Sequence, residues 1–269
     1  MTFGSIFGRT FSPTFQPSSQ AAGGAWSPTD ITGCKLWVDF SDANYLFTDA
    51  GLTKVSSDGD AIYQASDKSG NSANVTQLTA SKRPLYKTGI QNGLSASYYD
   101  GDDLLTNASC EVVNKNGSWT AFAVARATDL TSYRGILTQD NSSSASTRIA
   151  QFLRYVKTTG YLQSITFNTA SSPFFASKNA YTTGFSILSA VRTTSTIIAY
   201  VNNSAGTSTN TTGTPQSGAA TLGIGHTNLA SDQDLMKGYI GEVIIYNSAL
   251  SDTDRGTVET YLNNKWAIY

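Results

Sequence analysis

The chain has 269 residues, only 14% of them charged, and a formal net charge of −1. It has no run of Lys or Arg suited to a phosphate backbone, so we expect no nucleic-acid partner. The longest apolar runs, such as 241–246, are strand-sized and predict no membrane-spanning helix. The first residues do not resemble a secretory signal, so we expect synthesis and folding in a cytoplasm.

The composition favours an all-β protein. Thr, Ser, Asn and Gly are abundant, and the chain contains 14 Tyr and 12 Phe. β-branched and aromatic residues suit pleated, half-buried surfaces, whereas Gly, Ser and Asn supply turns. The length fits one large sandwich.

Residues 1–25 are rich in Ser, Gly and Pro and carry four phenylalanines at intervals of four: Phe3, Phe7, Phe11 and Phe15. That spacing would suit one helix face, but Pro13 and Pro17 oppose a continuous helix, so we predict an extended arm. Each exposed Phe would forgo about 1.5–3 kcal/mol of burial. The arm therefore needs a partner surface, on its own domain or on another chain, and we favour a neighbouring subunit.

The central part of the chain is predicted to alternate strands and turns. A first strand is expected at 35–40, a turn at 67–71, and loops over roughly the next thirty residues, up to an acidic turn at 100–103. Regular strands follow at 119–126, 135–139, 151–156, 162–168, 185–192, 196–202, 220–225 and 239–246. Such spacing is typical of a sandwich or jelly roll.

Three local patterns refine this outline. The strand at 119–126 alternates large residues with alanines, which predicts two differently packed faces. Residues 202–218 are predicted to form a polar hairpin loop. A helix is predicted at 251–266, because Ser251 can cap it and three apolar residues follow at intervals of four, namely Val258, Leu262 and Trp266.

Several stretches resemble one known family. Residues 36–43, 67–71, 81–86 and 99–105, with 238–251 and 261–266 near the end, are similar to the concanavalin A-like lectin/glucanase (laminin G-like) modules of phage virion and bacterial surface proteins. The resemblance implies a jelly-roll sandwich of two antiparallel sheets. We therefore expect an arm over 1–25 and one sandwich over 26–269 that includes the terminal helix.

Catalysis is not expected. A retaining glycosidase needs two carboxylates about 5 Å apart, commonly at alternating positions of one strand. The only glutamates are Glu111, Glu242 and Glu259, and no predicted strand carries acidic residues two or four apart. His226, the single histidine, has no acidic neighbour. Glu242 is accordingly expected to make a structural hydrogen bond.

Calcium is the one cofactor that the sequence suggests. Asp100, Asp102 and Asp103 could form a calcium site together with Asp39, Asp42 and Asp67, since Ca²⁺ prefers carboxylate and carbonyl oxygens. The alternative is an ordinary turn held by Asp side chains. Two cysteines, Cys34 and Cys110, are too few for a disulfide framework and are expected to be reduced.

Glycan binding would use exposed aromatic rings beside polar groups. The candidates, in expected loops, are Tyr133, Tyr161, Phe174, Phe175 and Tyr181. Each of these rings has an alternative role in packing.

Two functions compete. The first is a non-enzymatic bacteriophage virion protein: a capsid decoration or head-fibre subunit, anchored through residues 1–25 to a major capsid or tail protein. We expect a homo-oligomer, for which a trimer is a common arrangement. The alternative is a carbohydrate-binding receptor-recognition or adhesin module that binds host surface polysaccharide. A depolymerase is disfavoured because the acid pair is missing.

Overall fold

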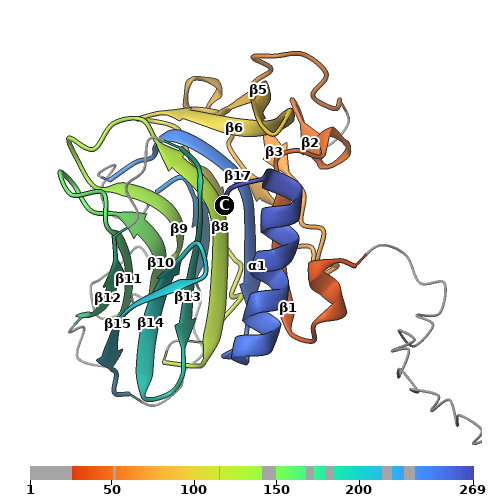
Figure 1. The fold of residues 1–269 in the computed structure, drawn as a ribbon. Coiled ribbons are helices and arrows are strands. Elements are labelled where there is room, and N and C mark those ends of the chain that lie inside the picture. The colour runs from red at the N-terminus through yellow and green to blue at the C-terminus, as the bar shows by residue number, and fades with distance from the viewer. Residues whose placement is uncertain are drawn as a thin grey trace, which may run out of the picture.

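The computed structural model describes residues 26–50, 53–114, 116–140, 150–167, 173–179, 184–213, 220–226 and 234–269. Two antiparallel β-sheets face each other, and one C-terminal helix covers the outer face of the first sheet (Figure 1). This architecture confirms the predicted sandwich. The expected arm over 1–25, with its four phenylalanines, lies outside the described residues.

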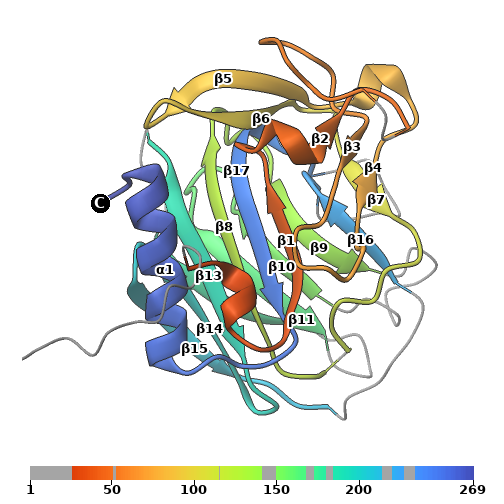
Figure 2. The ribbon, with the colours of Figure 1, turned by 90° about the vertical axis from the view of Figure 1, so that its right-hand side faces the viewer.

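The sheet under the helix, the helix-side sheet, has eight strands. In spatial order they are β15 (Ser204–Asn210), β14 (Thr196–Val201), β13 (Ser186–Arg192), β8 (Trp119–Ala127), β17 (Lys237–Tyr246), β6 (Leu94–Asp100) and β5 (Leu85–Gln91), and β1 (Cys34–Asp39) also pairs with β17. Figure 2 shows β13, β8, β17 and β1 running side by side next to the helix.

The second sheet has nine strands. They are β12 (Pro173–Lys178), β11 (Leu162–Phe167), β10 (Ala150–Tyr155), β9 (Arg134–Asp140), β16 (Thr221–Ile224), β7 (Leu105–Asn107), β4 (Val75–Thr76), β3 (Gln64–Ala65) and β2 (Leu46–Phe47). Short 3-10 turns occur at Pro28–Asp30, Ala43–Tyr45 and Ala80–Lys82. Within the described ranges, no helix has the length and apolar character needed to cross a membrane.

Strand β8 carries the two packing faces that its sequence predicts. Ala121, Ala123 and Ala125 belong to the core between the sheets. Phe122 and Val124 point the other way, into the cluster beneath the helix. Small residues let the two sheets approach, whereas the large ones fill the space under a helix.

Helix α1 (Asp252–Trp266) also agrees with the prediction. The hydroxyl of Ser251 accepts a hydrogen bond from the Asp254 amide at 3.1 Å and caps the first turn. The three predicted apolar residues are completely buried. A Cβ on Gly241 of β17 would lie 2.6 Å from the Trp266 ring, so only glycine lets that ring rest on the strand.

Residues 85–100 correct the expectation of a loop, because they form the hairpin of β5 and β6. Its turn consists of Asn92 and Gly93, both with positive φ, at 50° and 72°. Asn-Gly is the typical two-residue hairpin turn, a signal that the interrupted apolar pattern of the flanking strands obscures.

The polar segment after Asn202 corrects a second expectation, because it contains strand β15 and not only a loop. Its polarity follows from its position at the sheet edge, where β15 lies against β12, the edge strand of the second sheet (Figure 1). The Thr207 hydroxyl accepts from the Ser177 amide at 3.0 Å and donates to the Ser177 carbonyl at 3.2 Å. Thr209 donates to the Phe175 carbonyl. These hydroxyls satisfy backbone groups that an open edge would leave free.

Candidate functional site

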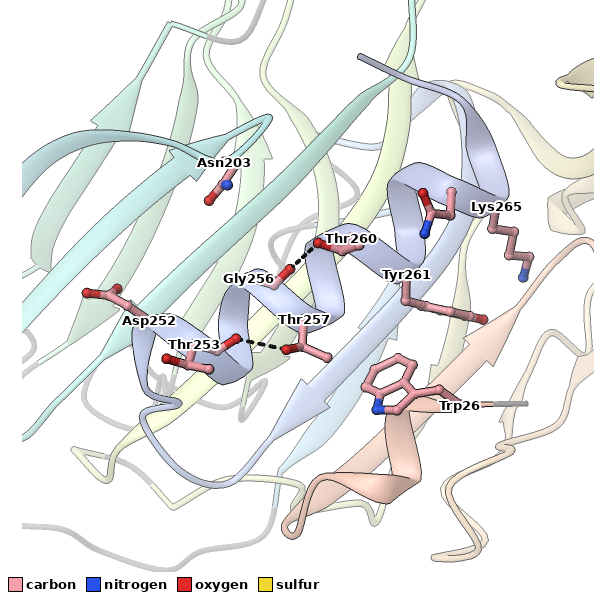
Figure 3. Close-up of a pocket in the computed structure, with 10 residues that line it drawn as sticks. Trp26, Asn203, Asp252, Thr253, Gly256, Thr257, Thr260, Tyr261 and Lys265 are labelled. Atoms are coloured by element: carbon pink, nitrogen blue, oxygen red, sulfur yellow. Dashed lines mark hydrogen bonds between the residues drawn. The ribbon is translucent and has the colours of Figure 1, made fainter. Parts of the chain in front are cut away.

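A groove of about 730 Å³ runs along the exposed face of α1 (Figure 3). Trp26 and Tyr261 lie together at one part of it, and Asn203 and Asp252 line it near the start of the helix. We call this feature the helix groove. No local pattern in the sequence predicts this groove, since Trp26 follows the expected arm and nothing around it indicates packing on the helix.

The aromatic part of the helix groove is held in place from below. The ring centroids of Trp26 and Tyr261 are 5.2 Å apart, with the planes at 53°. The Tyr261 hydroxyl donates to Oε1 of Glu242 at 2.9 Å, which fixes the tyrosine ring. Burial and the nearby Glu242 carboxylate raise the pKa of Tyr261 well above its usual value. The tyrosine is therefore a neutral hydrogen-bond donor across the physiological range.

The floor of the helix groove is one face of α1. Five residues recur there at offsets of 0, 3, 4, 7 and 11, namely Thr253, Gly256, Thr257, Thr260 and Asn264. The hydroxyls of Thr257 and Thr260 donate to helix carbonyls four residues earlier, at 3.0 and 2.8 Å (Figure 3). Because their protons are used in this way, the hydroxyl oxygens remain available as acceptors.

Gly256 has no structural reason to be glycine. A Cβ added there would meet nothing within 4 Å, and the backbone is ordinary helix. Glycine inside a helix costs about 1 kcal/mol relative to alanine. Threonine and asparagine are also weak helix formers, so the whole exposed face sacrifices helix stability. A ligand that lies across the helix would account for this choice of residues.

Two carboxylates lie beneath α1, on neighbouring strands. Asp39 of β1 is directly opposite Glu242 of β17, and the Nζ of Lys265 is 2.7 Å from Asp39 and 2.8 Å from Glu242. Trp37 and Trp266 donate their indole N–H groups to Glu242. Glu242 therefore holds the helix to the sheet, more than the single hydrogen bond that was expected of it.

The electrostatics of Asp39 and Glu242 favour a structural role over a catalytic one. Burial opposes ionisation of Asp39, but Lys265 and Lys68 outweigh it and hold its pKa below the usual range. Burial and the Asp39 charge raise the pKa of Glu242. Glu242 has no exposed surface, so a substrate in solvent cannot contact it. The sequence could not reveal the pair, because its members come from opposite ends of the chain.

The structure divides the six residues of the calcium hypothesis. The carboxylates of Asp100, Asp102 and Asp103 lie within 4.8 Å of one another. The other three are used elsewhere, so the expectation of a six-residue site is wrong: Lys68 binds Asp39 and Asp42 at 3.1 and 2.8 Å, and Asp67 accepts from backbone amides. Calcium at the acidic turn alone stays a prediction. Cys34 and Cys110 are free thiols, and burial raises the pKa of Cys34 to about 12.

The structure brings three of the five glycan candidates to one face of the second sheet. Leu162 points into the core, so its neighbours Tyr161 and Gln163 point outward, and Phe175, opposite Ile165, shares their face. Tyr133 joins them through Arg154, whose guanidinium lies 4.2 Å from the Tyr133 ring centre. We call the outer surface formed by Tyr133, Arg154, Tyr161, Gln163 and Phe175 the hairpin face.

The remaining two candidates are not on this face. Phe174 is half-buried and points to the other side of β12. Phe174 and Phe175 lie in a strand and not in the expected loop. Tyr181 lies outside the described residues.

No protein-family model matches the chain, and no curated protein matches it in sequence. Solved structures do match its fold. The receptor binding domain of botulinum neurotoxin C/D mosaic serotype has a TM-score of 0.54 and 12% identity, covering 87% of this chain and 52% of that one. Domain 4 of AbnA, a GH43 extracellular arabinanase from Geobacillus stearothermophilus, in complex with arabinotriose, has a TM-score of 0.56 and 14% identity, covering 84% and 98%.

The botulinum neurotoxin type G receptor binding domain is a further match, with a TM-score of 0.55 and 9% identity. The chain spans about half the length of these toxin domains. At such identities the likeness defines the fold alone. The fold is a sandwich of two antiparallel β-sheets, structurally similar to receptor binding domains and to a domain solved with a saccharide.

Proposed function

We propose that the protein is a non-catalytic carbohydrate-binding module for receptor recognition, and that the helix groove is its glycan site. The observation that carries this proposal is the aromatic pair of Trp26 and Tyr261 beside a row of hydroxyl and amide groups. The fold adds support, because one structural neighbour is described in complex with arabinotriose and others as receptor binding domains.

The groups in the helix groove suit a sugar. Aromatic rings offer flat apolar surfaces for the faces of sugar rings, and polar groups around them fix orientation. The oxygens of Thr257 and Thr260 can accept from sugar hydroxyls, and the exposed amide of Asn264 can both donate and accept. Gly256 lets a ring approach the helix backbone.

The charges around the helix groove favour a neutral glycan. Of the described residues that line the groove, Lys265 is the one cation. Asp39 and Glu242 compensate its charge. Asp252, with 91% of its side chain exposed, is the only acid that lines the groove in the described part of the chain. Nothing there would attract a polyanion.

Absence of catalysis is part of the proposal. Hydrolysis needs two carboxylates that reach the glycosidic bond, one of them as a proton donor. One carboxylate pair that the fold assembles, Asp39 and Glu242, is buried under α1 and shares Lys265. The other close carboxylates of the described residues, Asp100, Asp102 and Asp103, do not line the helix groove. This arrangement supports binding without turnover.

A glycan array of neutral and acidic saccharides tests the proposal, followed by calorimetry with the hits and with arabinotriose. Gly256→Trp has open space at its Cβ and places a bulky ring at the groove, so it should weaken binding about tenfold or more, whereas Gly256→Ala should preserve it. Trp26→Ala should also weaken binding. A blank array with folded protein, or full binding by Gly256→Trp, would exclude the helix groove as the site.

The virion hypothesis remains a prediction. The structural likenesses support the recognition alternative better than a capsid decoration or head-fibre subunit. Attachment through residues 1–25, a trimeric or other homo-oligomeric state, and location on a virion are likewise predictions. Mass spectrometry of purified phage particles would test them.

A further inference from the structure

The hairpin face lies on the outer face of the second sheet, on the side of the sandwich away from α1. Tyr161 and Phe175 are among its most open residues, with 43% and 42% of their surface exposed. Large exposed rings on a strand cost free energy unless they contact a partner. Tyr161 and Ile165, the residue opposite Phe175, are four positions apart, so the two rings stand about 13 Å apart along the strands.

Positive charge gathers between and beside these rings. Arg154 keeps only 12% of its side chain exposed and donates to Oε1 of Gln163 at 2.9 Å. The carboxylate nearest to Arg154 in the described part of the chain is that of Asp234, at a loose 3.9 Å. Lys157, in the turn between β10 and β11, places its Nζ 5.7 Å from the Tyr133 ring centre.

A pocket of about 390 Å³ adjoins the hairpin face where β12 meets β15, and we call it the edge pocket. Tyr161, Lys178 and Asn179 line it, together with Ser177 and Thr207. Lys178 is opposite Leu162 and points to the same side of β12 as Phe174, so Tyr161 is the residue that joins the pocket to the hairpin face. A Cβ on Gly206 would lie 2.2 Å from the Ser177 carbonyl oxygen, so glycine allows the two edge strands to approach. The Thr207 hydroxyl is hydrogen-bonded to the Ser177 backbone. The side chains of Lys178 and Asn179 are therefore the polar groups of the pocket best placed to bind a ligand.

The cations outnumber the acids here. Within the described ranges, Lys157 and Lys178 form no ion pair. Arg154 pairs there with a single carboxylate, that of Asp234. The chain as a whole has a net charge of −1, so this surplus is local. Lys178 has no carboxylate partner among the described residues and lies beside the Tyr161 ring and the Asn179 amide. Such a site suits a ligand that carries a carboxylate of its own.

We propose that the hairpin face and the edge pocket form a second saccharide site, which takes acidic sugars. One carboxylated residue enters the edge pocket, with its carboxylate at Lys178 and Asn179 and its ring against Tyr161. The rest of the saccharide lies over Arg154 and Gln163 toward Phe175. The site is independent of the helix groove, which we propose for a neutral glycan.

Paired soluble probes test this inference on the full chain. Trigalacturonate is compared with maltotriose, and 3′-sialyllactose with lactose, by calorimetry and by amide chemical-shift mapping. We expect at least one acidic probe to bind about tenfold or more tightly than its neutral partner, with weaker binding as salt rises. Shifts should map to Tyr161, Lys178 and Asn179.

Matched variants locate the effect. Lys178→Gln and Tyr161→Ala should each weaken acidic-probe binding about tenfold, and Lys178→Arg should retain most of it. Lys35→Gln removes a lysine from a different pocket and should change nothing. Gly256→Trp should leave acidic-probe binding intact, so failure of the helix groove and failure of this site give different results.

Four results would overturn the inference: no binding of either acidic probe, equal affinity for acidic and neutral partners, unchanged binding by Lys178→Gln, or equal binding of poly-L-glutamate. The last would indicate a surface for acidic peptides. Circular dichroism of each variant verifies folding; Tyr161 and Lys178 lie at the surface, so their loss should leave the fold intact.

Discussion

The Nζ of Lys265 lies 2.8 Å from Oε2 of Glu242, so the last turn of α1 is tied to the middle of β17 by a buried ion pair. Asp39 shares the same ammonium at 2.7 Å. The helix that forms the floor of the proposed glycan site therefore owes its position to charges that no local sequence pattern brings together.

Lys265→Met should destabilise the protein by about 3 kcal/mol, because it leaves the buried Glu242 without a cation and leaves Asp39 with Lys68 alone. Urea unfolding measures the loss. Lys87→Met is the control: its pair with Asp58 is exposed to solvent, so its loss should leave the urea midpoint nearly unchanged. Equal losses for the two variants would contradict a structural role for the buried pair.

Gly256→Ala should stabilise the protein by about 1 kcal/mol, since the methyl group meets nothing and alanine is the better helix former. Gly241→Ala should do the reverse, because its Cβ would lie 2.6 Å from the Trp266 ring. Thermal and urea unfolding of both variants give the comparison. A stability loss in Gly256→Ala would mean that the helix groove floor is packed rather than open.

The sequence predicts those parts of the fold whose signal is local. Alternation in β8, the Ser251 cap and the apolar spacing of α1 each depend on neighbouring residues, and each is confirmed. Strand β15 was missed because its polarity is set by the edge of another sheet. The hairpin of β5 and β6 is not predicted, because the interrupted apolar pattern of its two strands hides the signal of its Asn-Gly turn.

The candidate sites depend more on tertiary contacts. Exposed aromatics such as Tyr161 and Phe175 could be proposed from composition, but their common face follows from strand register. The contact of Trp26 with Tyr261, and the pairing of Asp39 with Glu242, join distant segments and have no sequence signal. The sequence shows that Gly256 is an unfavourable residue inside a helix, but only the structure shows that the space next to its Cα is open.

Asp103 predicts a dependence of stability on pH. Burial, with the Asp100 and Asp102 charges beside it, raises its pKa to about 7, above the roughly 3.9 of an unfolded aspartate. The folded state thus binds more protons between these values, and stability should fall as pH rises from about 4 to 7. Asp103→Asn should flatten this slope in thermal unfolding across that range. An unchanged slope would assign the pH dependence to other groups.

Calcium at the same turn should oppose that loss. A bound cation favours the ionised carboxylates of Asp100, Asp102 and Asp103, so added Ca²⁺ should raise the melting temperature above pH 7 and have little effect near pH 4. Chelator-treated protein provides the reference, and Mg²⁺ tests selectivity. The same Ca²⁺ response in Asp102→Asn would place the ion elsewhere, and no response in the native chain would end the calcium hypothesis.

Thr207 predicts how the sandwich protects its open edge. Its hydroxyl serves both the amide and the carbonyl of Ser177, so Thr207→Val, of nearly the same shape, should leave two backbone groups of β12 to water. We expect a loss of about 1 kcal/mol in urea unfolding, moderated because water reaches the edge. Thr207→Ser keeps the hydroxyl and should cost less.

Unpaired edge strands also invite pairing between chains, so Thr207→Val should self-associate more readily than Thr207→Ser in size-exclusion chromatography. If valine matches serine in both measurements, the close approach of the strands at Gly206, and not the threonine hydroxyl, seals the edge.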